Sequence, residues 1–127
     1  MDRAIIYHNP QCSKSRATLT LLEQQGLDPE VILYLENPPT PDAIDRICMG
    51  LACTPLQLMR IDEPRFGELE LSRSDHRTRS EWIRLLAENP VLMERPIVQI
   101  GDRVAICRPP EQVLSILEPP GTGRQDR

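Results

Sequence analysis

Residues 3–16 read RAIIYHNPQCSKSR, and this stretch carries the strongest signal for the fold. A short apolar run at 3–7 meets a polar loop that contains a proline, which is typical of a buried strand that ends in a turn. Residues 13–25 then predict a helix, because apolar side chains recur without a breaker until Gly26 stops it. The pattern therefore places Cys12 at a turn between a strand and a helix.

The residues that follow extend this stretch to a strand–helix–strand unit. Residues 30–35 (EVILYL) predict a second strand. Two strands joined by a helix within about 35 residues form a βαβ unit, so we expect them to be parallel. A proline-rich break follows, where Thr40 is expected to cap a helix that begins at Pro41.

The middle of the chain, about residues 41–90, predicts an all-helical insert. Its expected helices are at 41–50, 54–60, 63–69 and 78–88. Beyond the insert, two short apolar runs at 97–100 and 103–107 are joined by Gly101-Asp102. This pattern predicts a hairpin with a two-residue turn.

The order of the elements indicates the fold class. A last helix is expected at 110–118, so the order is βαβ, helical insert, then ββα. This is the topology of the α/β thioredoxin/glutaredoxin-like fold, with a small mixed sheet, and it predicts one domain over residues 1–118. Residues 119–127 are rich in proline and glycine and are expected to form a disordered tail. In such a fold the turn that holds Cys12 is the reactive place.

Composition excludes several classes of function. The net charge is −4 and the sequence pI is about 5.2, so the chain repels a nucleic-acid backbone, and its 3% of aromatic residues supply no stacking surface. No segment reaches the ~18 apolar residues of a membrane span, and the first residues lack the features of a signal peptide. Four cysteines are too few for a disulfide framework. We therefore expect a reduced, cytoplasmic protein without nucleic-acid or membrane partners.

Cys12 has the surroundings of a reactive thiol. The free N–H groups of the helix start and the helix dipole favour its thiolate, and the same groups can hold a small oxyanion. Nearby side chains that add positive charge or hydrogen-bond donors are His8, Lys14, Arg16, Ser13 and Ser15. The alternative is a buried structural cysteine, for which a polar loop flanked by cationic residues is a poor place. We therefore expect Cys12 to act as a nucleophile.

The turn around Cys12 contains no second thiol. A dithiol motif needs another cysteine three residues on, where this chain has Ser15, so an external thiol must resolve any adduct. The remaining cysteines, Cys48, Cys53 and Cys107, are expected to pack in the core, and a regulatory role for the first two is the alternative. With two histidines and no Cys-x-x-Cys pair, the chain is not expected to bind a structural metal ion.

Three arginines stand at the ends of apolar segments. They are Arg60, Arg95 and Arg108. The planar guanidinium group suits bidentate capture of a tetrahedral oxyanion. From spacing alone, an ordinary role as surface charge is favoured for each of them.

Short motifs along the chain carry a resemblance to a known family. They are HNPQCSKSR at 8–16, LYLENPP at 33–39, LMR at 58–60, ERPIV at 94–98 and RPPEQVL at 108–114. With these motifs, over about residues 4–118, the chain resembles the glutathione/glutaredoxin-dependent arsenate reductase (ArsC) family. The resemblance implies a thioredoxin-like fold and the detoxifying reduction of arsenate to arsenite, with glutathione and glutaredoxin supplying the electrons.

The resemblance also implies roles for single residues. Cys12 is similar to the family's nucleophile, which attacks arsenic to form a thiol–arsenate adduct. His8 matches the residue that helps to hold this cysteine as a thiolate, and Ser15 matches its hydrogen-bonding neighbour. The matches to the family's oxyanion-binding arginines are Arg60, Arg95 and Arg108. Pro96 matches the cis-proline of the fold.

The resemblance implies a small set of partners. Arsenate is the substrate, glutathione is a co-substrate that attacks the adduct, and glutaredoxin clears the mixed disulfide. No tightly bound cofactor is implied, and we expect a monomer. One alternative is a glutathione-linked monothiol oxidoreductase, which needs no converging arginines. The other is a non-enzymatic interaction protein like the Spx regulators, which share the fold and bind RNA polymerase. Their Cys-x-x-Cys switch is missing here because of Ser15.

Overall fold

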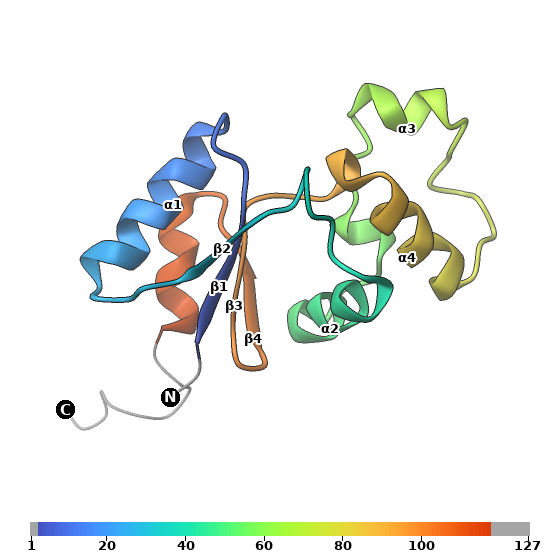
Figure 1. The fold of residues 1–127 in the computed structure, drawn as a ribbon. Coiled ribbons are helices and arrows are strands. Elements are labelled where there is room, and N and C mark those ends of the chain that lie inside the picture. The colour runs from blue at the N-terminus through green and yellow to red at the C-terminus, as the bar shows by residue number, and fades with distance from the viewer. Residues whose placement is uncertain (1–2, 118–127) are drawn as a thin grey trace. The chain divides into compact units, whose positions relative to one another are not determined.

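The computed structural model describes residues 3–117 (Figure 1). Its strands are β1 (Ala4–His8), β2 (Glu30–Leu33), β3 (Ile97–Ile100) and β4 (Arg103–Ile106). Its α-helices are α1 (Ser13–Gln24), α2 (Pro41–Leu51), α3 (Pro64–Glu68) and α4 (Arg79–Glu88). Its 3-10 segments are η1 (Leu56–Leu58), η2 (Pro90–Leu92) and η3 (Pro110–Ile116). The predicted tail at 119–127 lies outside the described residues.

The chain folds as two compact units. One unit consists of the chain up to Ile32 and from Arg95 onward, and the other is Leu33–Glu94. The second unit contains the predicted helical insert, formed by α2, α3 and α4 with η1 and η2. Among residues 3–117, no helix is long and apolar enough to cross a membrane.

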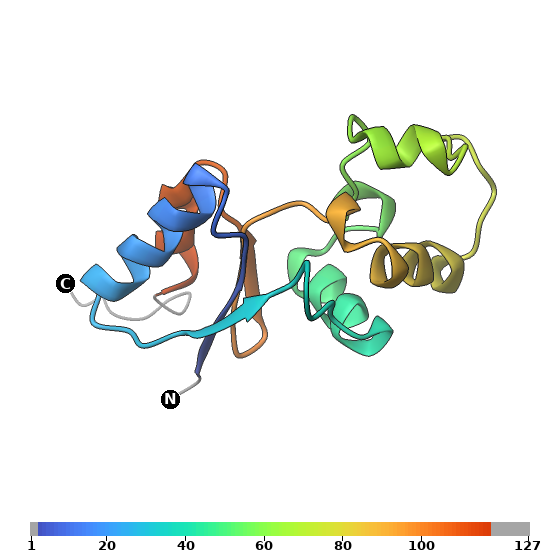
Figure 2. The same ribbon diagram turned by 45° about the horizontal axis from the view of Figure 1, so that its top comes forward.

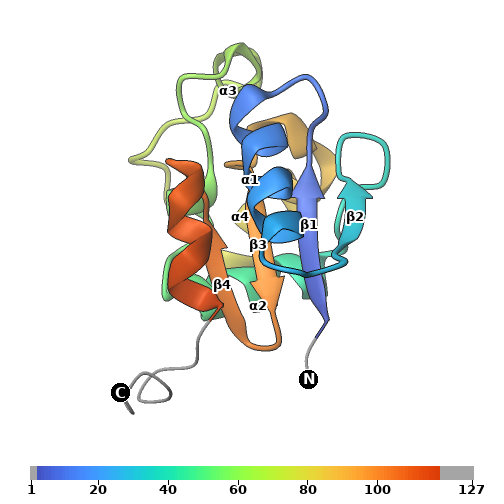
Figure 3. The ribbon, with the colours of Figure 1, turned by 90° about the vertical axis from the view of Figure 1, so that its left-hand side faces the viewer.

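The first unit is built on a four-stranded sheet in the order β2-β1-β3-β4. β1 pairs with β3 in antiparallel register, with Ala4 opposite Ile100 and Tyr7 opposite Ile97. β3 and β4 form the predicted antiparallel hairpin, and β2 points in the same direction as β1 (Figure 3). The sheet is therefore mixed, and the prediction of an α/β, thioredoxin-like fold is confirmed.

One face of this sheet packs against α1 and η3, which lie side by side (Figures 1 and 2). Because side chains alternate along a strand, Ala4 and Ile6 share that face with their cross-strand partners Ile100 and Val98. The same core cluster contains Leu22, Ala105, Cys107, Val113 and Ile116. His8 continues the alternation, so its side chain points toward the start of α1.

Local signals set the helix ends as predicted. α1 ends just before Gly26, whose φ of +82° is a conformation that glycine adopts readily. α2 begins at Pro41, and Thr40 Oγ1 accepts a hydrogen bond from a backbone N–H of the first turn at 3.1 Å. α4 begins with a capping box between Thr78 and Glu81, a signal that the sequence analysis did not use.

The prediction of a helix at 54–60 is wrong for most of its length. Only Leu56–Leu58 is helical, and it forms a 3-10 segment. The chain then pairs with the segment after η2, because Met59 forms an antiparallel bridge with Met93. Both methionines are buried, so apolar burial favours this pairing over a further helical turn.

The predicted helix at 110–118 is a 3-10 helix over Pro110–Ile116 rather than an α-helix. Its buried residues Val113 and Ile116 are three positions apart, and this spacing places both on one face of a 3-10 helix. The second predicted strand also ends early, at Leu33, where a turn begins.

The residue that ends α2, Ala52, has a backbone conformation that destabilises the fold, and a substitution can test this. Ala52 has φ 55° and ψ 43°, the left-handed region, which costs a residue with a Cβ about 1–2 kcal/mol. Glycine adopts this conformation freely but loses more entropy on folding, so Ala52→Gly is expected to raise the free energy of unfolding by about 0.5–1 kcal/mol. Urea unfolding measures this gain as a higher midpoint at an unchanged slope. An unchanged or lower midpoint contradicts the prediction.

Candidate functional site

The turn between β1 and α1 is closed by its own hydrogen bonds. The N–H of Cys12 donates to the carbonyl of Asn9 at 2.9 Å, and the N–H of Gln11 donates to Asn9 Oδ1 at 3.0 Å. Arg16 Nη1 donates to the carbonyl of Pro10 at 2.8 Å. The turn thus holds Cys12 at the N-cap position of α1 with an extended backbone, φ −97° and ψ 122°.

The Cys12 thiol lies at the start of α1, where the first backbone N–H groups have no carbonyl partner within the helix. Burial raises its pKa, but the backbone N–H groups of Ser15 and Lys14 donate to the sulfur, and the Arg95 guanidinium adds its charge and a hydrogen bond. The net result is a Cys12 pKa below that of an ordinary thiol. The residue is only half-buried, so a small solute can reach it.

Strand pairing explains how Arg95 reaches a residue so distant in the chain. β3 runs antiparallel to β1, with Ile97 opposite Tyr7, so the residues just before β3 lie beside the end of β1. The Cys12 turn begins at that end. Arg95 therefore approaches the thiol from the neighbouring strand, while the N–H donors belong to α1.

His8 and Ser15 form a buried pair beside this turn. His8 Nδ1 lies 2.6 Å from Ser15 Oγ, and the N–H of Asn9 donates to the same oxygen at 3.0 Å. Burial lowers the pKa of His8, and the charge of Arg16 lowers it further, so the imidazole is neutral at pH 7. The Ser15 hydroxyl can then donate its proton to Nδ1. The pair is linked to Cys12 through the backbone N–H of Ser15 rather than through a charged imidazole.

The Arg95–Pro96 peptide bond is cis, as the resemblance predicts. The carbonyl of Pro96 accepts a hydrogen bond from the N–H of Cys107 at 2.9 Å. Arg108, the residue after Cys107, is exposed, and its Nη1 donates to the carbonyl of Arg95 at 3.3 Å. A second cis bond, Arg108–Pro109, is not anticipated by the sequence analysis. The fold thus brings Arg95 and Arg108 together.

Arg60 belongs to the Leu33–Glu94 unit, and its described contacts lie within that unit. Its Nη1 donates to the carbonyl of Val91 at 3.3 Å and lies 2.9 Å from Glu63 Oε2. Its backbone N–H donates to the carbonyl of Leu92 at 2.6 Å. The expected role of Arg60 in holding an oxyanion stays a prediction.

Asn9 is the residue of this site that the sequence analysis missed. It closes the Cys12 turn with its side chain and supports Ser15 with its N–H. The signal for it is the dipeptide Asn9-Pro10, because asparagine before proline favours the start of a turn.

Together these groups place hydrogen-bond donors and a positive charge around the Cys12 thiol, an arrangement that suits a small anion. A thiolate flanked by N–H donors and a guanidinium can attack an electrophilic atom whose oxygens the same donors hold. Within residues 3–117, no group of three or more His, Cys, Asp or Glu side chains is arranged to hold a metal ion.

Comparisons with known proteins agree on the family. The ArsC family model matches residues 7–116. The uncharacterized protein YfgD of Escherichia coli K12 is 45% identical over 113 residues, which are 88% of this chain and 94% of that protein. An arsenate reductase of Haemophilus influenzae is 42% identical over 114 residues, 89% of this chain and 97% of that one. The structure of an arsenate reductase from Vibrio cholerae has 44% identity and a TM-score of 0.85, covering 91% of this chain and 98% of its own. The chain belongs to the ArsC family.

Proposed function

We propose that this chain is an arsenate reductase that uses Cys12 to convert arsenate to arsenite. The observation that carries the proposal is the Cys12 thiol of lowered pKa, held between the N–H donors of α1 and the Arg95 guanidinium. Arsenate is a tetrahedral oxyanion, and these donors suit such an anion. The family relative from H. influenzae, which bears the name arsenate reductase, supports the choice of substrate.

In the first step the Cys12 thiolate attacks the arsenic atom. A sulfur–arsenic bond forms and one arsenic–oxygen bond breaks, and that oxygen takes up protons and leaves as water. Arsenic stays pentavalent in this step, because no electrons pass between the atoms. The N–H groups of Ser15 and Lys14 and the guanidinium of Arg95 stabilise the charge on the remaining oxygens.

In the second step glutathione attacks the adduct. Over both steps, one arsenate and two thiols, those of Cys12 and glutathione, give arsenite, one mixed disulfide and water. Two electrons pass from the sulfur pair to arsenic. Glutaredoxin then exchanges the mixed disulfide with further glutathione and restores the Cys12 thiol.

We assign the second thiol to glutathione, because the first unit offers no suitable one near Cys12. Ser15 occupies the place of the second cysteine in a dithiol motif. Cys107 has no exposed surface, and burial raises its pKa to about 12. A thiol in that state is a poor nucleophile at neutral pH.

His8 and Ser15 act as positioning residues in this proposal. Ser15 Oγ joins the end of β1 to the first turn of α1 through His8 and through the N–H of Asn9. The first turn of α1 is the part of the helix that binds the Cys12 sulfur. Holding that turn in place keeps the N–H donors directed at the thiolate and at the bound oxyanion.

Alkylation at different pH values tests the state of the Cys12 thiol. The pKa of Cys12 is lowered, whereas burial raises the pKa of Cys48, Cys53 and Cys107. Because the thiolate is the reacting form, the alkylation rate rises as the pH rises through the pKa. With iodoacetamide, followed by mass spectrometry at Cys12, we expect an inflection at a lower pH than for an ordinary, solvated thiol.

The matched control is Cys12→Ser, in which alkylation of the remaining cysteines is followed; it is expected only at higher pH, because burial raises their pKa values. An inflection at or above the ordinary thiol value in the unaltered chain contradicts the assignment of Cys12 as a stabilised thiolate.

Arsenite production by the purified chain is the direct test of the function. Arsenate, glutathione, glutaredoxin, glutathione reductase and NADPH are combined with the protein, and the arsenite formed is measured. We expect turnover that depends on the protein, on glutathione and on glutaredoxin. Absence of arsenite above the background without protein contradicts the proposed function.

A further inference from the structure

Two thiols meet at the C-terminal end of α2, far from Cys12 in the sequence. The N–H of Cys53 donates to the carbonyl of Cys48 at 3.0 Å, and the N–H of Ala52 donates to the carbonyl of Met49 at 3.1 Å. With Ala52 in the left-handed conformation, these bonds form a Schellman motif. In this motif the two residues that share the longer-range bond often bring their side chains into contact. Here both residues are cysteines.

The backbone bond between Cys53 and Cys48 places the two cysteines next to each other at the end of α2. A hydrogen bond between the thiols raises the pKa of Cys48, and the same bond lowers that of Cys53. Burial has the largest effect on both and raises both pKa values, that of Cys48 to about 12. The two cysteines are therefore neutral thiols at pH 7, and no disulfide links them.

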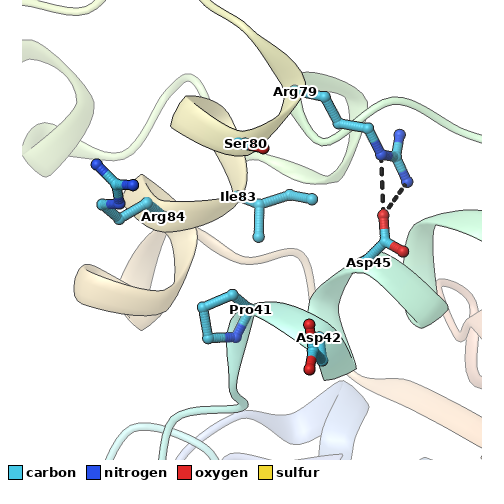
Figure 4. Close-up of a pocket in the computed structure, with 7 residues that line it drawn as sticks. All are labelled: Pro41, Asp42, Asp45, Arg79, Ser80, Ile83 and Arg84. Carbon is cyan, nitrogen blue, oxygen red and sulfur yellow. Dashed lines mark hydrogen bonds and ion pairs between the residues drawn. The ribbon is translucent and has the colours of Figure 1, made fainter.

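One side of the pair lies near charged, accessible groups. The Arg79 guanidinium lowers the pKa of both thiols, and Asp45 raises that of Cys48. Arg79 Nη2 lies 2.8 Å from Asp45 Oδ1, and both side chains are more than 40% exposed (44% and 42%). Figure 4 shows this contact beside a cavity of about 260 Å³ between the first turns of α4 and α2, whose lining residues do not include either cysteine.

We propose that Cys48 and Cys53 form a dithiol site that binds trivalent arsenic through both sulfurs. Arsenous acid and two thiols give two arsenic–sulfur bonds and two water molecules, while the third hydroxyl stays on arsenic. No electron transfer is needed. The chemistry of the site is independent of Cys12, but its relevance to this chain rests on the proposed function, whose product is trivalent arsenic.

The number of ligands favours trivalent arsenic over zinc. A structural zinc ion needs four protein ligands, usually cysteine or histidine. Among residues 3–117, no cluster of three or more His, Cys, Asp or Glu is arranged to hold a metal ion, so the pair has no further ligands for zinc. Trivalent arsenic forms stable products with two thiolate ligands and one further group, and soft ions prefer thiolates.

The two thiols differ in access, which sets the order of bond formation. Cys53 is half-buried and Cys48 has no exposed surface. Arsenic therefore bonds first to Cys53, and opening of the last helical turn then admits it to Cys48. Helix ends open at lower cost than helix centres. Because the second bond is intramolecular, two thiols are expected to bind arsenic about 10²–10⁴ times more tightly than one.

The experiment uses phenylarsine oxide, a trivalent arsenical that takes two thiols and releases one water. The protein is the full chain with Cys12→Ser and Cys107→Ala, which leaves Cys48 and Cys53 as its thiols. We expect one phenylarsenic group per chain by intact mass and loss of both reactive thiols. Titration then gives the affinity.

Adding Cys53→Ser to this protein is expected to weaken the affinity by about 10²–10⁴-fold. Cys48→Ala should give a similar loss. The matched control is Met49→Ala, because Met49 carries a sulfur on the same helix turn but is 69% exposed and has no thiol. It should leave the affinity unchanged. Circular dichroism checks that each variant is folded, and Cys53→Ser alone carries the test if the buried Cys48→Ala unfolds.

Equal affinity for phenylarsine oxide with and without Cys53→Ser overturns the proposal. The absence of a stoichiometric adduct in the two-thiol protein also overturns it. Since that protein lacks Cys12, its result does not depend on arsenate reduction. Failure of the proposed function instead appears as a lack of arsenite formation by the unaltered chain. Failure of the dithiol proposal and failure of the proposed function can therefore be distinguished.

Discussion

Cys12→Ser is expected to reduce arsenite formation to the background of the assay. The proposed reaction needs a thiolate, and the N–H groups of Ser15 and Lys14 with Arg95 lower the pKa of Cys12 toward that state. A serine hydroxyl in the same place remains protonated at neutral pH, and it cannot form a mixed disulfide with glutathione. The coupled assay with arsenate, glutathione and glutaredoxin measures the loss.

Cys107→Ala is the matched control for this experiment. It also removes one thiol from the first unit, but Cys107 packs in the core cluster and does not belong to the proposed reaction. Most of the activity is expected to remain in this variant. Full activity in Cys12→Ser contradicts the proposed role of Cys12.

The same experiment separates the alternative functions. If the unaltered chain forms no arsenite while Cys12 alkylates as a thiol of low pKa, a glutathione-linked oxidoreductase becomes the better interpretation. If Cys12 is also unreactive, an interaction protein is favoured. Binding to RNA polymerase subunits in a pull-down then tests that interpretation.

Arg95→Ala is expected to lower kcat/KM for arsenate by about 10- to 150-fold. A lost hydrogen bond to a charged group costs about 1.5–3 kcal/mol, and each factor of ten corresponds to about 1.4 kcal/mol. Arg95 both contacts the Cys12 thiol and carries a guanidinium suited to an oxyanion, so its removal affects nucleophile and substrate together. Steady-state kinetics with arsenate measures the change, and alkylation should show a higher Cys12 pKa in the variant.

Arg3→Ala is the matched control, because Arg3 is 65% exposed and its described ion pair is a long one, 4.0 Å, with Glu30. Its kcat/KM should equal that of the unaltered chain. An unchanged kcat/KM in Arg95→Ala shows that this guanidinium does not hold the substrate. Arg60→Ala and Arg108→Ala are also expected to weaken the use of arsenate more than they weaken folding.

Local patterns were enough to predict most of the fold. The strand–turn–helix stretch at 3–16, the Thr40-Pro41 cap and the hairpin at Gly101-Asp102 occur as expected. Each depends on hydrogen bonds and dihedral preferences among residues that are neighbours in the chain. The predictions at 54–60 and 110–118 were wrong in helix type because distant packing outweighed local preference there.

Parts of the candidate site likewise depend on local sequence, and other parts depend on tertiary packing. Cys12 and the N–H groups that bind its sulfur lie within one helical turn of each other, so local sequence alone predicts the lowered pKa of this thiol. Its role as the nucleophile stays a prediction. The contact with Arg95 needs the antiparallel register of β1 and β3, and the neutral state of His8 needs burial under α1. Register and burial result from packing between segments that are far apart in the chain, and a local pattern does not contain that information.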